Sequence, residues 1–441
     1  MFVASKLPKL TTTSGWVELL DRRTPTLPLQ KAITVDIAII GAGFAGLSAA
    51  RRISQIDSTI TVALLEATII GEGAAGRNSG FIIDLPHEVS SDDYGGNSLV
   101  RSKQDIFLYR SAIDLAAGVA EDQQWGPEIF NPCGRYSVAM GSRGEEHIKA
   151  YAKQLTALGE RHQILSATDI SQITGTPAYT AGLFMPGTVI VQPAAYIRGV
   201  ADSLRAPIQV FEQTPALSFE VKNGSWLIKT PNGSVTAQKI ILANNGYARD
   251  FGFFQKTLMP IFTYASMTEA FDPDLLSGQR QWAATPALPM GTTVRRIAGN
   301  DGDRILIRSR YTFSTKVQVS ESAVNSAGKA HDKKFANRFP MLPKVRMQYR
   351  WGGEMAVTLN GVPAFGEVAP GVISACGCNG LGASKSTAAG IAAADFAMEK
   401  STPILDIFNN YAPPKKLPAE PFLSIGASAN LYMKELLAGR E

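Results

Sequence analysis

The sequence has little of what marks a metalloprotein, a disulfide-rich protein or a nucleic-acid-binding protein. Its three cysteines are Cys133, Cys376 and Cys378, and the run CGC lacks the spacing of a metal site or a redox CxxC motif. The four histidines are scattered without ligand spacing, so we expect no bound metal. The formal net charge of +5 is small for 441 residues, and no run of five basic residues occurs, which argues against nucleic acid as a partner.

Long apolar runs are also absent. No uninterrupted apolar segment reaches the length of about 18 residues that a transmembrane helix needs. The N-terminal stretch MFVASKLPKLTTTSGWVELLDRRTP contains no apolar core of the signal-peptide type, and with so few cysteines we expect a cytoplasmic protein. Hydrophobic residues at 45% and charged residues at 18% predict a globular chain with ample core, long enough for two domains or one elaborated domain.

Two nearly continuous apolar runs near the N-terminus predict parallel strands that are buried on both faces. The run TVDIAII begins at Thr34, and TITVALLEA extends from Thr59 to Ala67. Between them, a helical pattern of apolar residues runs through Leu47, Ala50 and Ile53. Further predicted elements are helices over 145–162 and 192–204, a hairpin with the turn signals KNGS and PNGS, a buried strand over 239–247, a strand over 304–313, and a strand, glycine turn and small-residue helix over 371–397.

A glycine turn joins the first predicted strand to the first predicted helix. Gly41, Gly43 and Gly46 form the pattern GxGxxG, in which the first glycine permits a tight turn, the second lets backbone approach a pyrophosphate and the third lets helix and strand pack closely. The helix N-terminus then faces the phosphates. Glu66 stands at the end of the next predicted strand, where its carboxylate can accept hydrogen bonds from ribose hydroxyls. The arrangement predicts a dinucleotide-binding site.

A second glycine cluster, GEGAAGRNSGF, follows the second strand at once. A nicotinamide-binding domain would normally continue with further strand–helix units at this point. The cluster carries Arg77 and Asn78, and its backbone amides and one cation could lie along a long, rigid cofactor such as a flavin. By itself, the cluster could equally be a solvent-exposed loop with one basic residue.

The two glycine clusters together resemble the FAD-dependent D-amino-acid oxidase (DAO) superfamily, most closely its γ-glutamylputrescine oxidase and glycine/sarcosine oxidase-like branch. Members of that branch carry GxGASGRNGG at the second cluster, where this chain has Ala75 and Ser79 in place of Ser and Gly. The resemblance continues in QPAAYIRGVADSLRAPIQVFEQTPAL, KIILANNGY, YRWGGEMAVTLNGVPAFGEV and CGCNGLG. It spans about residues 28–398, which is most of the chain.

The resemblance implies a fold that combines α/β and α+β architecture. A Rossmann-like FAD-binding domain of the GR2/DAO type is interleaved with a substrate domain built on a mostly antiparallel β-sheet flanked by helices. We expect a leader over 1–33, a discontinuous FAD-binding domain over 34–85, 188–255 and 346–400, a substrate domain over 86–187 and 256–345, and a C-terminal extension over 401–441.

The resemblance also implies which residues hold FAD. The expected cofactor residues are Gly41, Gly43, Phe44, Ala45, Gly46, Glu66, Ala67, Arg77, Asn78, Ser79, Gly80, Ala216, Asn245, Gly246, Gly380, Leu381 and Gly382. The last three precede a predicted helix whose N-terminal N–H groups can stabilise negative charge on a reduced flavin. Some relatives attach FAD through a cysteine, but Gly353 stands at the matching position, so we expect noncovalent FAD; Cys378 could still lie near the ring.

Candidate substrate residues come from the more divergent segments. In the strand RILIRSRYTF, alternation places Arg308 and Arg310 on one face, where two guanidiniums could bind a carboxylate, while Tyr311 falls on the other face with the isoleucines. A solvent-facing basic strip is the alternative. His87 could point into the cleft, Trp351 could wall the substrate pocket and Glu354 could receive a substrate ammonium, although each could equally be structural.

These features predict an oxidoreductase that removes hydride from the C–N bond of a small amine or amino acid and gives an imine that hydrolyses to a carbonyl product. The electron acceptor is oxygen or another molecule. Two alternatives stay open. One is a flavin-dependent 2-hydroxy acid or alcohol oxidoreductase, with His87 as the base. The other is a catalytically idle FAD-binding subunit, which the substitutions at Ala75 and Ser79 would permit.

Overall fold

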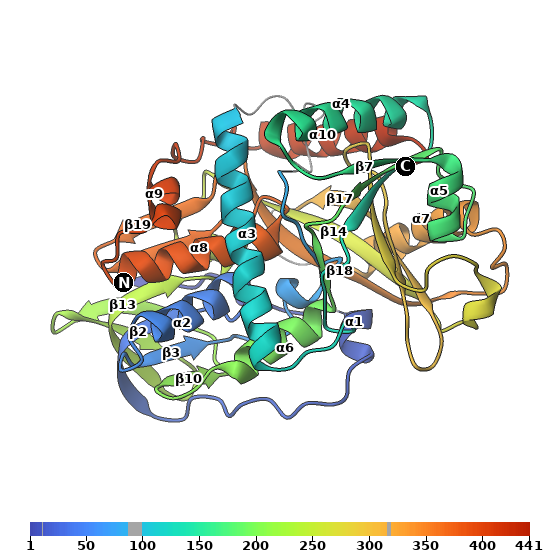
Figure 1. Cartoon of the computed structure of the whole chain (residues 1–441). Helices are drawn as coiled ribbons and strands as arrows, with labels where there is room; N and C mark the ends of the chain where they lie inside the picture. The colour runs from blue at the N-terminus through green and yellow to red at the C-terminus, as the bar shows by residue number, and fades with distance from the viewer. Residues whose placement is uncertain (11, 87–98, 315–318) are drawn as a thin grey trace.

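Two large β-sheets, each covered by helices, organise the chain (Figure 1). The structure is a computed structural model, and it describes residues 1–10, 12–86, 99–314 and 319–441. Short antiparallel pairings of β4 (Phe81–Ile82) and β5 (Phe130–Asn131) with β9 (Val189–Val191) form a third, small sheet.

The first sheet contains the predicted parallel strands. Its main path runs β1-β11-β12-β13-β2-β3-β10, and β20 pairs with both β13 and β19. Strands β10, β3, β2, β13 and β20 are mutually parallel, as their nearly continuous apolar runs predict. The bounds of its strands are β1 (Phe2–Val3), β2 (Ala32–Ile40), β3 (Val62–Leu65), β10 (Ile208–Phe211), β11 (Ser218–Lys222), β12 (Ser225–Lys229), β13 (Ser234–Leu242), β19 (Ala364–Ala369) and β20 (Val372–Cys376).

Helices α2 (Phe44–Ile56), α8 (Gly382–Ala397) and α3 (Leu99–Asp122) gather beside this sheet (Figure 1). Their apolar faces share one core with β2, β3 and α6 (Pro193–Ser203). Small residues let α2 and α8 approach closely, since a Cβ added at Gly390 would lie 2.1 Å from the carbonyl oxygen of Ala45. Because α2 follows β2 and α8 follows β20, and these strands are parallel members of one sheet, both helices start at the same end of the sheet.

The second sheet is mostly antiparallel and runs β18-β14-β17-β16-β15-β6-β8-β7. Its strands are β6 (Arg135–Ala139), β7 (Gln163–Ser166), β8 (Ala181–Met185), β14 (Leu258–Thr268), β15 (Trp282–Pro286), β16 (Thr293–Ile297), β17 (Arg304–Phe313) and β18 (Met347–Thr358). The strand pairing departs from the predicted domain boundary at residue 346. Strand β18 pairs with β14 along its length, so it belongs to the second sheet and not to the cofactor sheet.

Local turn signals account for several elements. The predicted hairpin joins β11 to β12 through Asn223 and Gly224, both with positive φ, as a type I′ turn requires. The predicted helix over 145–162 is α4 (Ser142–Leu158), and it ends at Gly159 in the left-handed conformation. The remaining helices are α1 (Gly15–Glu18), α5 (Ala167–Thr174), α7 (Glu321–Arg338), α9 (Pro403–Asn409) and α10 (Phe422–Ala438), and the 3₁₀ segments are η1 (Ala74–Gly76), η2 (Asn245–Phe251) and η3 (Pro273–Leu275).

The C-terminal extension packs against the second sheet. Helix α10 lies on β17, and Glu435 of this helix forms an ion pair with Arg310 at 3.2 Å. The last residue, Glu441, is only 4% exposed, and its carboxylate accepts hydrogen bonds from the backbone of Met140 and Leu288. The extension is therefore part of the substrate-side layer.

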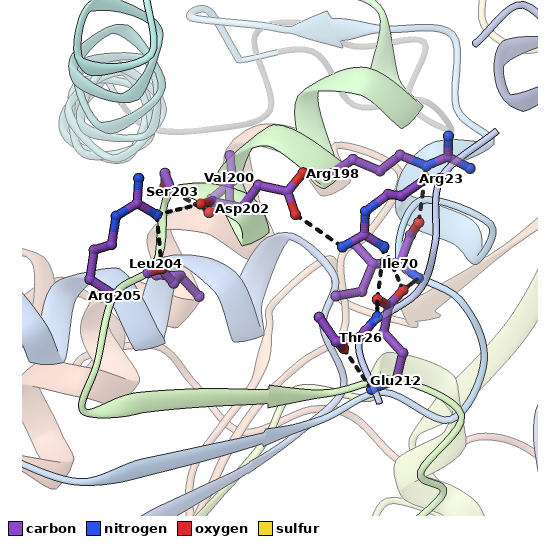
Figure 2. Close-up of polar contacts among 10 residues, drawn as sticks. All are labelled: Arg23, Thr26, Ile70, Arg198, Val200, Asp202, Ser203, Leu204, Arg205 and Glu212. Carbon is purple, nitrogen blue, oxygen red and sulfur yellow. Dashed lines mark hydrogen bonds and ion pairs between the residues drawn. The ribbon is translucent and has the colours of Figure 1, made fainter. Parts of the chain in front are cut away.

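The leader is also built into the fold. Strand β1 adds to the edge of the first sheet, and Trp16 of α1 is fully buried. Figure 2 shows the middle of the leader held by the buried carboxylate of Glu212, which accepts two hydrogen bonds of 2.8 Å from Arg23 and one each from the backbone N–H groups of Thr26 and Ile70. A buried carboxylate with this many donors is well compensated, so it fixes the path of the leader.

Candidate active site

A cavity of about 360 Å³ lies where the carboxyl ends of β2 and β3 meet strands β14, β17 and β18. Ligands of open α/β sheets bind at this end of the strands. The predicted cofactor residues that line the cavity are Gly41, Gly43, Phe44, Ala45, Glu66, Ala67, Arg77, Asn78, Ser79, Ala216, Asn245, Gly246, Gly380, Leu381 and Gly382. Gly46 and Gly80 are not among its lining residues.

The three glycines of the first turn have three different environments. Gly41 has a φ of +106°, and its N–H donates to the carbonyl of Leu65 at 2.8 Å. A Cβ at Gly46 would lie 1.8 Å from the Gly41 oxygen, so only glycine permits this contact between helix and strand. A Cβ at Gly43 would meet only Ala75, at 3.6 Å. Gly43 therefore leaves room beside the N-terminus of α2, where free N–H groups favour an anion.

Glu66 lies at the end of β3, on the cavity wall. One carboxylate oxygen accepts a hydrogen bond from the N–H of Ala42 at 3.1 Å, and the other accepts from the N–H and hydroxyl of Thr68 at 2.9 and 2.8 Å. A carboxylate offers about four lone-pair sites. Glu66 is thus held in place with capacity left for a ribose hydroxyl.

Four consecutive carbonyl oxygens of the second glycine turn, those of residues 77–80, accept hydrogen bonds from other segments. The Arg77 oxygen accepts from the indole of Trp351 at 2.9 Å, and the Asn78 oxygen accepts from the indole of Trp16 at 2.8 Å. The next two carbonyls, of Ser79 and Gly80, accept from the guanidinium of Arg295 at 2.7 and 3.3 Å. In a planar trans peptide, the N–H points opposite to the C=O. The N–H groups of Asn78 and Ser79, which both line the cavity, therefore point away from the indoles of Trp351 and Trp16.

Arg295 explains why Gly80 does not line the cavity. A Cβ at Gly80 would lie 2.0 Å from an Arg295 nitrogen, because the guanidinium is buried against this turn. Burial lowers the pKa of Arg295 to about 9. Neither composition nor a motif pointed to this residue, since its position depends on the pairing of β16 in the second sheet.

Arg77 lies on the cavity wall, but its guanidinium is already engaged. It donates to the backbone carbonyls of Glu72 at 2.6 Å and Gly352 at 3.1 Å, and also to the carbonyl of Thr12. Burial lowers the pKa of Arg77 to about 10. The side chain thus ties the leader and β18 to the glycine turn instead of facing the cavity as a free cation along a pyrophosphate.

Two further turns complete the cofactor side. Asn245 accepts hydrogen bonds through Oδ1 from the N–H groups of Gly377 at 3.0 Å and Cys378 at 3.3 Å, which joins the end of β13 to the turn after β20. Gly380 follows with a φ of +83°, and α8 then begins without a side-chain cap on its first N–H groups. These uncapped N–H groups make the N-terminus of α8 a place where negative charge is stabilised.

The cavity wall thus combines two helix N-termini, a turn whose N–H groups at Asn78 and Ser79 face away from its donors, a carboxylate at the end of β3, and Gly43, which leaves open space beside the first helix. This set fits FAD. The family model for FAD-dependent oxidoreductases (DAO) matches residues 36–396. The chain belongs to this family. The predicted resemblance, the fold class and FAD as the cofactor are therefore confirmed.

Individual relatives agree with the assignment. The probable oxidoreductase OrdL of Rhizobium meliloti (strain 1021) is 27% identical over 437 residues, 95% of each chain. The γ-glutamylputrescine oxidoreductase of Escherichia coli (strain K12) is 26% identical over 402 residues, 84% of this chain and 85% of that protein. Among solved structures, glycine oxidase from Geobacillus kaustophilus has the same fold, with a TM-score of 0.67 at 21% identity over 84% of this chain and 96% of that one.

The substrate side of the oxidoreductase differs from the sequence-based expectation. Arg308 lines the cavity, but Arg310 does not. The pairing of β17 with β14 shifts at this point, because Ser309 opposes Tyr264 and Tyr311 opposes Thr263. Arg310 is the extra residue of this bulge and has a φ of +64°, so its side chain turns to Glu435 of α10.

The same bulge brings Tyr311 to the face of Arg308. The guanidinium of Arg308 donates to the Tyr311 hydroxyl and lies 4.8 Å from the ring centroid. Both residues line the cavity. Strict alternation put Tyr311 on the opposite face, so sequence reasoning missed it. A bulge shifts alternation by one residue, and no turn residue in RILIRSRYTF announces it.

Glu354 is a buried carboxyl on the cavity wall. Its Oε1 is buried without a hydrogen-bond partner in the described part of the chain. Burial and the nearby charge of Asp250 raise the pKa of Glu354 to about 8, although Arg249 and Tyr247 oppose the shift. An unpartnered polar atom on a residue of the cavity wall indicates a place for a ligand group.

Trp351 does not wall the cavity. It is 0% exposed and packs with Trp16 and Met267 behind the second glycine turn, to which its indole donates. His87 lies outside the described residues. Cys378 lines the cavity, with its sulfur 3.5 Å from the Ala356 carbonyl oxygen. Among the described helices, none is both long and apolar enough to cross a membrane.

Proposed function

We propose that this flavoenzyme oxidises the C–N bond of a small amine that carries a carboxylate, such as an amino acid. The observation that carries the proposal is that Arg308 and Glu354, whose Oε1 has no partner among the described residues, line the same cavity. A guanidinium recognises a carboxylate, and a free carboxyl oxygen accepts a hydrogen bond from an amine. The related γ-glutamylputrescine oxidoreductase also acts on a nitrogen compound, as its name states.

Arg308 fixes the carboxylate end of the substrate. Its contact with Tyr311 limits the freedom of the guanidinium, so less entropy is lost when it binds. The bound flavin supplies a hydride acceptor, while the protein orients the C–H bond. Positioning by Arg308 at one end and Glu354 at the other would set that orientation.

Glu354 would select the protonation state of the amine. With a pKa of about 8, this carboxyl is mostly neutral at pH 7 and offers no counter-charge to an ammonium. Its Oε1 can still accept a hydrogen bond from a neutral amine, the form whose nitrogen lone pair supports loss of hydride. We therefore assign Glu354 to a neutral amine, and not to the substrate ammonium that the sequence suggested.

Anaerobic bleaching of the yellow chromophore tests the proposal. Amino acids and carboxylated amines should bleach it, whereas 2-hydroxy acids and amines without a carboxylate should do so far less. Bleaching by hydroxy acids alone would refute the proposal and support an alcohol oxidoreductase, and colour without any bleaching would indicate an idle subunit. Oxygen uptake during turnover identifies the electron acceptor.

We place the enzyme in the cytoplasm, because its three cysteines are free.

A further inference from the structure

The N-terminal segment Ala4–Leu10, called the strap below, crosses the cofactor side of the cavity. At one end, the N–H of Ala4 donates to the carbonyl of Leu217 at 2.9 Å. The N–H of Ser5 donates to the backbone carbonyl of Asp250 at 3.0 Å, and the Ser5 hydroxyl donates to the Asp250 carboxylate at 2.7 Å. Beyond the other end, the Thr12 carbonyl accepts a hydrogen bond from Arg77. The strap thus extends from the neighbourhood of Ala216 to the second glycine turn.

Between these anchors, the strap forms part of the cavity wall. Its lining residues are Ala4, Lys6, Leu7, Pro8, Lys9 and Leu10. Leu7 and Leu10 are 40% and 36% exposed, so their side chains are not packed into a core. The strap and the first glycine turn with Glu66 therefore line the same cavity, and the strap leaves its interior open.

The charges on the cavity wall show what the strap contributes. The described cations that line the cavity are Lys6, Lys9, Arg77 and Arg308. Arg77 donates to backbone carbonyls, and Arg308 lies with Tyr311 on the second sheet. No ion pair or hydrogen bond holds the ammonium groups of Lys6 and Lys9 within the described residues, and both side chains are exposed. The two strap lysines are the uncommitted positive charges on the cofactor side.

We propose that the strap closes over the adenosine diphosphate half of FAD, and that Lys6 and Lys9 supply the counter-charge to its doubly negative diphosphate. The glycine turns offer the diphosphate only backbone dipoles, and Arg77 is engaged elsewhere. An ammonium on an exposed lysine binds a phosphate as a point charge, without the fixed geometry that a guanidinium requires. The proposal rests on FAD as the cofactor and not on the substrate.

Flavin binding to the apoprotein tests the proposal directly. The variant Lys6→Gln/Lys9→Gln should bind FAD about tenfold more weakly at low salt, within the range expected for two exposed charge pairs. Its affinity for riboflavin, which has no phosphate, should equal that of the wild type. The loss for FAD should shrink at high ionic strength, because salt screens exposed charges. Quenching of flavin fluorescence measures both affinities.

Lys31→Gln is the matched control. Lys31 is exposed in the same N-terminal region but does not line the cavity, so this variant should bind both flavins as the wild type does. An unchanged FAD affinity in the double variant would overturn the proposal. An equal loss for FAD and riboflavin would also overturn it, because the strap would then act only through the fold.

A third variant separates the strap from its charges. Ser5→Ala removes the hydroxyl bond to Asp250 and keeps both lysines. It should release FAD about two- to fivefold faster, as expected for one lost exposed hydrogen bond, whereas release at the wild-type rate would show that the strap does not cover bound FAD. Circular dichroism of each apoprotein verifies that it is folded, and the single variants Lys6→Gln and Lys9→Gln give the same readout should the double variant fold poorly.

Discussion

Replacement of Glu354 by glutamine should flatten the pH dependence of stability of the apoprotein. The carboxyl is buried, and its folded pKa of about 8 lies above its ordinary value of 4.5. A group whose folded pKa is raised gives stability that is fully present below its unfolded pKa and is lost as the pH rises through its folded pKa. The native protein should therefore lose stability between pH 4.5 and pH 8 because of this single group.

The expected size follows from the shift. Each pH unit in the middle of this window removes about 1.4 kcal/mol from the free energy of unfolding, and the slope is smaller near each pKa, so the loss between about pH 5 and pH 8 is ~3.5 kcal/mol. Glutamine keeps the size of the side chain and has no proton to lose. Glu354→Gln should gain this amount over the wild type as the pH rises.

Urea unfolding of the apoprotein at a series of pH values measures the effect. Glu146→Gln, an exposed change on α4, is the control and should keep the wild-type slope. If the free energies of unfolding of Glu354→Gln and wild type differ by a constant amount from pH 5 to pH 8, then Glu354 is not a buried carboxyl with a raised pKa. Under turnover, the same variant should lose the break near pH 8 in the pH profile of kcat/KM.

Four substitutions and one assay test other parts of the site. Arg308→Met should raise KM for a carboxylated substrate roughly 10- to 100-fold, as expected for a lost charged hydrogen bond, while Arg310→Met, outside the cavity, should leave KM unchanged. Gly46→Ala should destabilise the apoprotein by ~1–3 kcal/mol through its clash with the Gly41 oxygen. Gly43→Ala should leave the apoprotein stable but weaken FAD binding in a fluorescence titration. Acid precipitation should release all of the FAD into the supernatant, because a glycine stands at the position of the attachment cysteine.

Most of the predicted cofactor residues line the cavity, because the sequence signals that pointed to them are local. Gly41, Gly43 and Gly46 are set by a turn of a few residues, and Glu66 follows on the adjacent strand. Such spacing survives in any fold that places a helix after a parallel strand. The same holds for Asn223 and Gly224, which have the positive φ values that a tight hairpin turn requires.

The substrate side could not be read in this way, because its geometry depends on contacts between distant segments. The bulge at Arg310 exists only in the pairing of β17 with β14, and it exchanges the positions of Arg310 and Tyr311. Trp351 has the composition of a pocket wall, yet it supports the glycine turn from behind. Its role depends on β18 joining the second sheet, which periodicity does not specify.

The second glycine turn shows how the two sheets are coupled. Its four consecutive carbonyls accept hydrogen bonds from Trp16 in the leader, Arg295 on β16 and Trp351 on β18. Each donor comes from an element outside the cofactor sheet, so the turn takes its shape only when the second sheet and the leader are folded. Buried carbonyls without donors are costly, and the same donors that satisfy them orient the peptides so that the N–H groups of Asn78 and Ser79 point the other way. The substrate layer thus helps to build the FAD site, and a change in either sheet affects both.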